Sequence, residues 1–183
     1  MKQRQYVRGF QFARKKIDEP ENDNNKQFAD AQLPEYQTKG AAAADFFAAD
    51  DVEIPSIWLS VMQFFKQGGF LNDVTPTLVH TGIKAFMADD EVLEICNRSS
   101  GPKKKGLVLA NSIGIIDSDY YNNKDNDGEI MFAFYNFKFS NITIHKGDRI
   151  GQGMFKKVLR AQAGLRTKDV ERVSGFGSTE TTK

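Results

Sequence analysis

Short apolar segments separated by turn-forming residues are the feature that most restricts how this chain can fold. Stretches rich in β-branched and aromatic residues recur along the chain, at residues 6–13, 92–96, 107–110, 130–135, 142–144 and 149–158. Large side chains at Ile130, Phe132 and Phe134 follow the two-residue period of a strand with one buried face. Many short strands without a series of helices predict an all-β protein, an antiparallel β-sandwich or barrel.

One segment has the period of a helix instead. Trp58, Val61, Met62 and Phe65 are spaced as one apolar stripe, and two glycines follow at 68–69. We therefore expect a short helix at about 56–67. Four alanines at 41–44 could begin a second helix, but one turn alone is a weak basis for a helix.

Length and composition exclude several classes of protein. The chain has 183 residues, with 25 basic and 24 acidic side chains. This length favours a single domain, expected at 1–170, followed by a flexible tail at 171–183. The net charge of +1 argues against a nucleic-acid coat protein, and no segment is long and apolar enough to cross a bilayer. The single cysteine, Cys96, forbids an intrachain disulfide, which suits a reducing cytoplasm.

Aromatic residues are dominated by phenylalanine. Fifteen phenylalanines accompany five tyrosines and one tryptophan. Because phenyl rings pack well between sheets, we expect most of them to lie in the core.

Two segments carry groups suited to chemistry. Arg98, Ser99, Ser100 and the following glycine offer a guanidinium, two hydroxyls and backbone donors that could hold phosphate oxygens, with lysines at 103–105 adding positive charge. The same residues could instead form a turn beside a solvated edge. Asp117 follows two isoleucines that favour a strand, so its carboxylate would lie at the strand end. It could act there as a general base or cap a turn.

The C-terminal segment contains a third pattern. Phe176 lies between two glycines and is followed by Gly177 and Ser178, while Arg172 precedes it. A phenyl ring with a glycine on each side fits a lid that stacks on a ligand, whereas a disordered terminus is the alternative.

In this order and spacing, the patterns resemble the five motifs of the trimeric deoxyuridine triphosphatase (dUTP diphosphatase, dUTPase) family, in particular its phage and Gram-positive members. The matching segments are residues 38–45, residues 98–100, Asn111 with residues 114–120, residues 147–152, and Arg172 with residues 175–179. The resemblance covers about residues 30 to 180, and it implies a jelly-roll-like fold.

The resemblance also implies an activity and roles for individual residues. Family members hydrolyse dUTP to dUMP and pyrophosphate, with Mg²⁺ on the triphosphate. Asp117 would activate the attacking water, and Asp45 would lie in the outer shell of Mg²⁺, through water. The remaining residues that would bind substrate are Arg98, Ser99, Ser100, Asn111, Gly114, Ile116, Tyr120, Met131, Arg149, Gln152, Arg172, Phe176, Gly177 and Ser178. Among them, Asn111 and the nearby hairpin would pair with uracil, and Tyr120 would exclude a 2′-hydroxyl.

The family's assembly and location are implied in the same way. A homotrimer would share its active sites between subunits in the cytoplasm, that of a bacterial host if a phage encodes the chain. Compared with the family pattern, Ala43, Ala44 and Gly153 replace other residues, and residues 122–128 and the helix at 56–67 are insertions. The inserted helix could add to the core or bind a protein partner.

Alternative functions remain open at this stage. A dCTP deaminase on the same fold would need a carboxylate near the cytosine amino group, for which Glu129 is the nearby candidate. A regulatory protein with this fold would use the inserted helix. A nucleic-acid binder using the lysines at 103–105 is disfavoured by the near-zero net charge.

Overall fold

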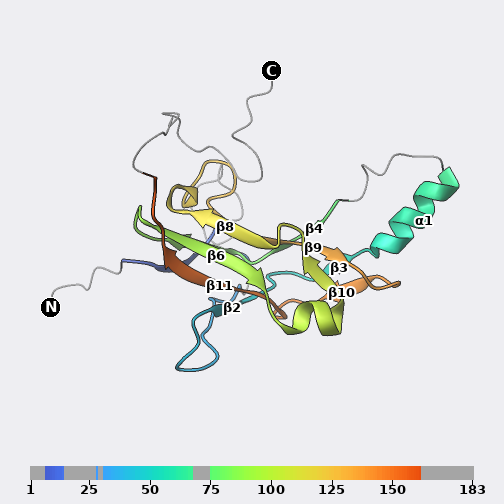
Figure 1. Cartoon of the computed structure of the whole chain (residues 1–183), viewed down its shortest axis with the longest axis horizontal. Coiled ribbons are helices and arrows are strands. Elements are labelled where there is room, and N and C mark those ends of the chain that lie inside the picture. The colour runs from blue at the N-terminus through green and yellow to red at the C-terminus, as the bar shows by residue number, and fades with distance from the viewer. Residues whose placement is uncertain (1–6, 15–27, 29–30, 68–74, 162–183) are drawn as a thin grey trace, which may run out of the picture.

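The computed structural model describes residues 7–14, 28, 31–67 and 75–161 (Figure 1). In these ranges strands predominate, which confirms the all-β, jelly-roll-like class. No helix in the same ranges has the length and apolar character needed to cross a membrane.

All strands of the described residues pair in antiparallel orientation. The largest sheet contains, in spatial order, β2 (Ala44–Phe47), β11 (Arg149–Lys157), β6 (Glu91–Asn97) and β8 (Ile113–Asp117). A second sheet contains β4 (Thr77–His80), β9 (Met131–Asn136) and β7 (Leu107–Leu109). Two further pairs join β1 (Gly9–Phe12) to β5 (Ile83–Phe86) and β3 (Val52–Ile54) to β10 (Ile142–Ile144).

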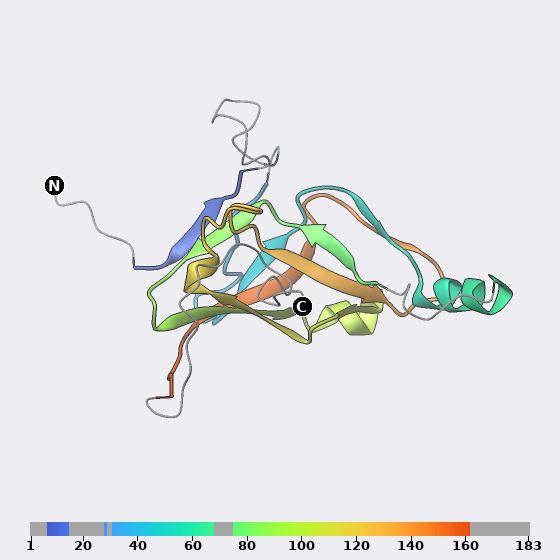
Figure 2. The ribbon, with the colours of Figure 1, turned by 90° about the horizontal axis from the view of Figure 1, so that it is seen from above.

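In the described part of the chain, three short helical elements lie between the strands. The predicted helix is confirmed as α1 (Ile57–Gln67), which projects from one end of the molecule in both views (Figures 1 and 2). A π-helical turn, η2 (Gly101–Lys105), follows β6, and a 3₁₀ turn, η3 (Ser118–Tyr120), follows β8.

The strands predicted from the sequence are confirmed with small shifts at their ends, and 142–144 matches β10 without a shift. The four alanines do not begin a helix, because Ala44 starts β2, where Asp45 and Phe46 pair with β11. Strands β2 to β5 were not predicted, since each has only three or four residues and no clear alternation.

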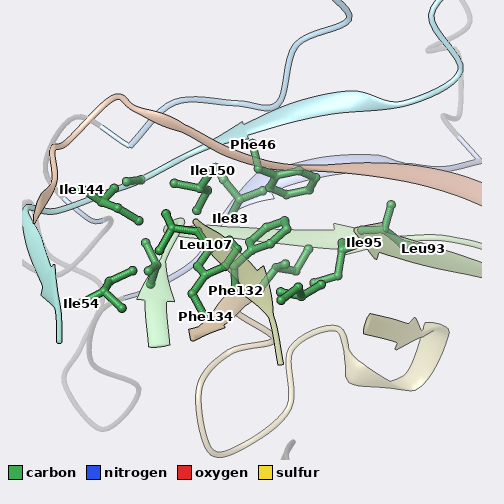
Figure 3. Close-up of a cluster of buried hydrophobic side chains, with 14 of the residues drawn as sticks. Phe46, Ile54, Ile83, Leu93, Ile95, Leu107, Phe132, Phe134, Ile144 and Ile150 are labelled. Carbon is green, nitrogen blue, oxygen red and sulfur yellow. The ribbon is translucent and has the colours of Figure 1, made fainter. Parts of the chain in front are cut away.

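Phenyl rings connect the strands through the core, as the composition predicts. Phe46 contacts Phe10 and Phe132 with ring centroids 5.4 and 5.5 Å apart, and Phe132 stacks on Phe134. Figure 3 shows Phe46 and Ile150 facing Phe132 and Phe134 across the cluster. Burial of each such side chain stabilises the fold by about 1.5–3 kcal/mol.

Apolar side chains of α1 remain outside this core. Phe65 is 77% exposed, and Trp58 and Met62 are also exposed. The helix therefore does not extend the hydrophobic core through these three side chains.

A glycine on β11 allows the core rings to approach the backbone. A Cβ atom added at Gly151 would lie 1.9 Å from the ring of Phe132, which is fully buried. Only a residue without a side chain permits that contact.

We expect Gly151→Ala to lower the free energy of unfolding by about 1–3 kcal/mol, because the added methyl group overpacks a core that cannot easily move. Urea denaturation measures this change. Gly40→Ala is the matched control, since a Cβ at Gly40 would meet nothing within 4 Å. Equal unfolding midpoints for the two variants would contradict the packing argument.

Candidate active site

A cavity of about 240 Å³ lies between the end of β6 and the start of β11. Three cationic side chains line it, Arg98, Lys105 and Arg149, together with Ser100. The floor is apolar and comes from the core, through Leu107, Phe134, Ile144 and Ile150. Positive charge above a rigid apolar floor suits a small anion.

Local backbone geometry forms the rim of this cavity. The chain leaves β6 and turns, with Gly101 N donating to Arg98 O at 2.9 Å, and then forms η2. Gly106 ends η2 in the left-handed conformation, with φ of +66°. This turn brings Lys105 back to the cavity, where its Nζ donates to Asp148 at 2.9 Å.

Asp45 joins the two arginines of the cavity. It is 6% exposed on β2, and its two carboxylate oxygens accept from Arg98 Nε at 3.1 Å and from Arg149 Nη1 at 3.4 Å. A carboxylate between two guanidiniums fixes both and leaves their remaining N–H groups for a ligand.

Two predicted phosphate-binding residues lie outside the cavity lining. Ser99 is exposed on the turn after β6. Gln152 pairs with Cys96 across β11 and β6, and its Nε2 donates to Cys96 Sγ at 3.5 Å. Asp148 and Lys105 do line the cavity, although sequence reasoning did not select them; Lys105 was noted only as local charge.

A second group of predicted residues surrounds the turn between β7 and β8. The expected hairpin is wrong here, because β7 pairs with β9 and β8 pairs with β6, so the turn connects two sheets. Asn111 is exposed at its turn, and Ser112 there has φ of +60°. A Cβ at Gly114 would lie 2.6 Å from Ile95 and 3.2 Å from Asn111 Nδ2, so the glycine allows this close packing. Ile116 is half-buried towards the end of β8.

Asp117 is the last residue of β8 and is half-buried, as the strand prediction requires. Tyr120 follows on η3 and is only 5% exposed, with its hydroxyl donating to Glu129 O at 3.0 Å. Met131, half-buried at the start of β9, pairs with His80 on β4.

The two groups lie at opposite ends of β6. Asp117 pairs with Val92, whereas Arg98 lies six residues farther along the chain, just beyond the other end of that strand. At about 3.3 Å per residue, the backbone positions of Val92 and Arg98 are about 20 Å apart, and this separation exceeds the length of a triphosphate. Figures 1 and 2 likewise show η3 and η2 at opposite ends of the largest sheet. One chain alone therefore does not bring these groups together.

The predicted lid residues Arg172, Phe176, Gly177 and Ser178 lie outside the described residues.

The described residues suit a Mg²⁺ ion carried by the substrate better than one held in a protein cage. Among them, no group of three His, Cys, Asp or Glu side chains could hold a metal. Asp45 already accepts from two arginines, yet each carboxylate oxygen has a second lone pair that could accept from a metal-bound water. Mg²⁺ usually keeps several waters and binds substrate phosphates, so an outer-shell role for Asp45 fits.

Comparison with known proteins gives consistent results. The sequence pattern of the dUTPase family matches residues 70–180. A deoxyuridine 5′-triphosphate nucleotidohydrolase from Lactococcus lactis subsp. lactis is 40% identical over 151 residues, 82% of this chain and 89% of the relative. The crystal structure of dUTPase from Streptococcus mutans superposes with a TM-score of 0.64 at 34% identity, covering 85% of this chain and 99% of that one.

A more distant structure shares the fold alone. A mutant dUTPase from phage φ11 of S. aureus is 15% identical, with a TM-score of 0.56 over 76% of this chain and 92% of that one. The fold thus defines a jelly-roll-like protein, in which the two groups of predicted site residues lie at opposite ends of β6. Given the family match over more than half of its length, the chain belongs to the dUTPase family.

Because Arg149 lines the cavity, we expect it to contribute directly to the binding of pyrophosphate. We expect Arg149→Ala to weaken pyrophosphate affinity about 10- to 100-fold, because hydrogen bonds to charged groups contribute about 1.5–3 kcal/mol. Isothermal titration calorimetry measures the affinity. Lys104→Ala removes the same charge from an exposed side chain outside the cavity lining and should have little effect. Equal losses in both variants would show that only overall charge matters.

Proposed function

We propose that this protein hydrolyses dUTP to dUMP and pyrophosphate. The observation that carries the proposal is the family match over residues 70–180, which includes both the cationic cavity and the Asp117 group. The cavity supplies cations for phosphates, and the strand end supplies a carboxylate.

Asp117 would act as the general base. Its carboxylate accepts a proton from water while the water oxygen forms a bond to the α-phosphorus. The bond from that phosphorus to the bridging oxygen breaks, and pyrophosphate leaves with the electron pair. Asp117 would contribute to this step in two ways. It would accept the proton of the water, and its half-buried place at the end of β8 would hold the carboxylate in position.

Substrate selection would depend on the β7–β8 turn and η3. Asn111 and the backbone near Gly114 would pair with uracil, and Ile116 and Met131 would bound the pocket. Close packing at Gly114 supports a rigid turn that rejects bases of another shape. Tyr120 would pack beneath the deoxyribose and leave no room for a 2′-hydroxyl.

Phosphate binding would use Arg98, Ser100 and Arg149, with Ser99 and Gln152 added once the full site is assembled. Bound Mg²⁺ would reduce repulsion between the triphosphate and the attacking oxygen. Asp45 would hold Arg98 and Arg149 in place and accept from a water bound to the ion.

A homotrimer would complete the site, because residues separated by the length of β6 must come from different copies. Two exposed isoleucines support this assembly. Ile113 and Ile115 are about half exposed on β8, the edge strand of the largest sheet, where another copy could cover them. Analytical ultracentrifugation should give a mass near three chains, and a monomer at micromolar concentration would contradict the shared site.

Deaminase chemistry is disfavoured by the contacts of Glu129. This residue is 4% exposed, and its carboxylate accepts from Gly82 N at 3.0 Å and interacts with His80 Nδ1 at 3.0 Å. A carboxylate occupied in this way is poorly placed to serve as the base of a deaminase.

Pyrophosphate release from dUTP, compared with dCTP, dTTP and UTP, tests the proposed activity with and without Mg²⁺. Selective release from dUTP is the expected result, whereas ammonia from dCTP would favour the deaminase. Equal rates for all four nucleotides would contradict the specificity assigned to the β7–β8 turn.

We expect Asp117→Asn to lower kcat for dUTP about 100- to 10,000-fold, because the amide cannot accept the proton of the attacking water. Binding of a non-hydrolysable dUTP analogue should be retained. Asp125→Asn makes the same change at an exposed position and serves as the control. Wild-type turnover in the Asp117 variant would remove this residue from the proposed chemistry.

A second candidate function is binding of a protein partner at α1. Trp58 stacks on Phe139, which is 81% exposed, and donates from Nε1 to Phe137 O at 3.1 Å. The result is an ordered apolar surface on an inserted element, continued by Met62 and Phe65. A partner recovered with the wild type but not with Met62→Glu, at unchanged dUTP turnover, would support this role. Equal recovery with both would exclude this surface.

The tail and the location remain proposals from the family resemblance. Residues 171–183 would close over the nucleotide, with Phe176 stacking on uracil and Arg172, Gly177 and Ser178 near the phosphates. We propose a cytoplasmic location, where dUTP is formed and consumed.

A further inference from the structure

The inserted loop at residues 122–128 forms a compact unit through its own asparagines. Asn123 is 5% exposed, and its Oδ1 accepts from the backbone N–H groups of Asp125 and Asn126, both at 3.0 Å. Its Nδ2 donates to Tyr120 O at 3.0 Å and to Asn126 Oδ1 at 2.8 Å. These bonds fix the loop against the turn that carries Tyr120.

A buried carboxylate anchors the same loop to the rest of the protein. Asp127 is fully buried and accepts from Arg14 N at 2.9 Å, from the Arg14 guanidinium at 2.8 Å and from Lys84 Nζ at 2.8 Å. Lys84 Nζ also donates to Asn122 Oδ1 at 2.6 Å. Burial alone would raise the pKa of Asp127, but the hydrogen bonds from Arg14 and Lys84 lower it overall, so the anchor remains ionised near neutral pH.

Asn126 connects this anchored loop to the Tyr120 side chain. Its Nδ2 donates to the Tyr120 hydroxyl at 2.8 Å, and that hydroxyl donates to Glu129 O at 3.0 Å. Asn126 Oδ1 accepts from Asn123 Nδ2 and from Gly128 N, so the amide has a defined orientation. The tyrosine hydroxyl therefore has one donor and one acceptor partner, and its ring is restrained at the far end.

Restraint of this ring has a consequence for sugar recognition. A ring that excludes a single hydroxyl group by steric contact must stay in a fixed position. A displacement of the ring by about 0.5 Å is enough to degrade such a site. A tyrosine held only by its own packing could move aside for a ribose.

We propose that Asn126 is a positioning residue that fixes the Tyr120 ring and thereby sets the discrimination between 2′-deoxyribose and ribose. The inference rests on the proposed function, in which Tyr120 packs beneath the sugar.

Asn126→Asp is the sharpest variant, because it keeps an oxygen for Asn123 and Gly128 but cannot donate to the tyrosine hydroxyl. We expect the ratio of kcat/KM for dUTP to that for UTP to fall about tenfold, mainly through a lower KM for UTP. Asn122→Asp makes the same chemical change in the same loop and retains an acceptor for Lys84. It leaves the bond from Asn126 to the Tyr120 hydroxyl in place. In this control, the ratio of kcat/KM for dUTP to that for UTP should equal the wild-type ratio.

Tyr120→Phe removes the bond between Asn126 and the Tyr120 hydroxyl from the other side, together with the bond from that hydroxyl to Glu129 O, and leaves the hydrogen bonds among the loop asparagines intact. It should give a similar loss of selectivity, and the double variant should lose no more than either single one, because the effects of coupled residues do not add. Tyr120→Phe also provides the test if Asn126→Asp does not fold, as judged by thermal melting.

Two outcomes distinguish a failure of the role inferred for Asn126 from a failure of the position that the proposed function assigns to Tyr120. If Tyr120→Ala lowers the dUTP-to-UTP ratio while Asn126→Asp, or Tyr120→Phe in its place, leaves it unchanged, the role of Asn126 is wrong and the proposed function stands. If Tyr120→Ala also leaves the ratio unchanged, the position assigned to Tyr120 in the proposed function is wrong, and the inference falls with it.

Discussion

The length of strand β6 is the constraint on which the rest of the account depends. Arg98 lies just beyond one end of this strand, and Asp117 pairs with Val92 near its other end. An extended backbone cannot shorten, so about 20 Å of strand separates Val92, the partner of Asp117, from Arg98 at the cavity. If Asp117 is the general base, as we propose, catalysis on one nucleotide would require groups from different copies, and the exposed isoleucines of β8 would form a surface for association.

The hydrophobic core supports the cationic cavity from below. Phe132 packs directly on Gly151 of β11, and Phe134 and Ile150 from the same cluster form part of the cavity floor. Asp45 on the neighbouring strand then orients both cavity arginines. The cations are thus placed before a ligand arrives, which is the condition for strong electrostatic stabilisation of a transition state.

Periodic and local features were predictable from the sequence, whereas contacts between distant segments were not. The large side chains of β9, the stripe of α1 and the strand ending at Asp117 were all visible as short-range patterns. Strand β2 could not be predicted in this way. The alanine run before it favours a helix locally, but pairing with β11 outweighs that preference in the folded protein. No pattern of residue spacing in the sequence predicts the ion pair between Asp45 and Arg98. The same holds for the hydrogen bond between Asn126 and the Tyr120 hydroxyl.

Mixing two inactive variants tests the proposed shared site most directly. Asp117→Asn lacks the base and Arg149→Ala lacks a phosphate ligand, so each assembly alone should release little pyrophosphate from dUTP. After the two proteins are unfolded together and refolded, some sites would combine an intact Asp117 from one copy with an intact Arg149 from another. The account predicts that the mixture regains a measurable part of wild-type activity. A mixture no more active than its separate components would contradict it.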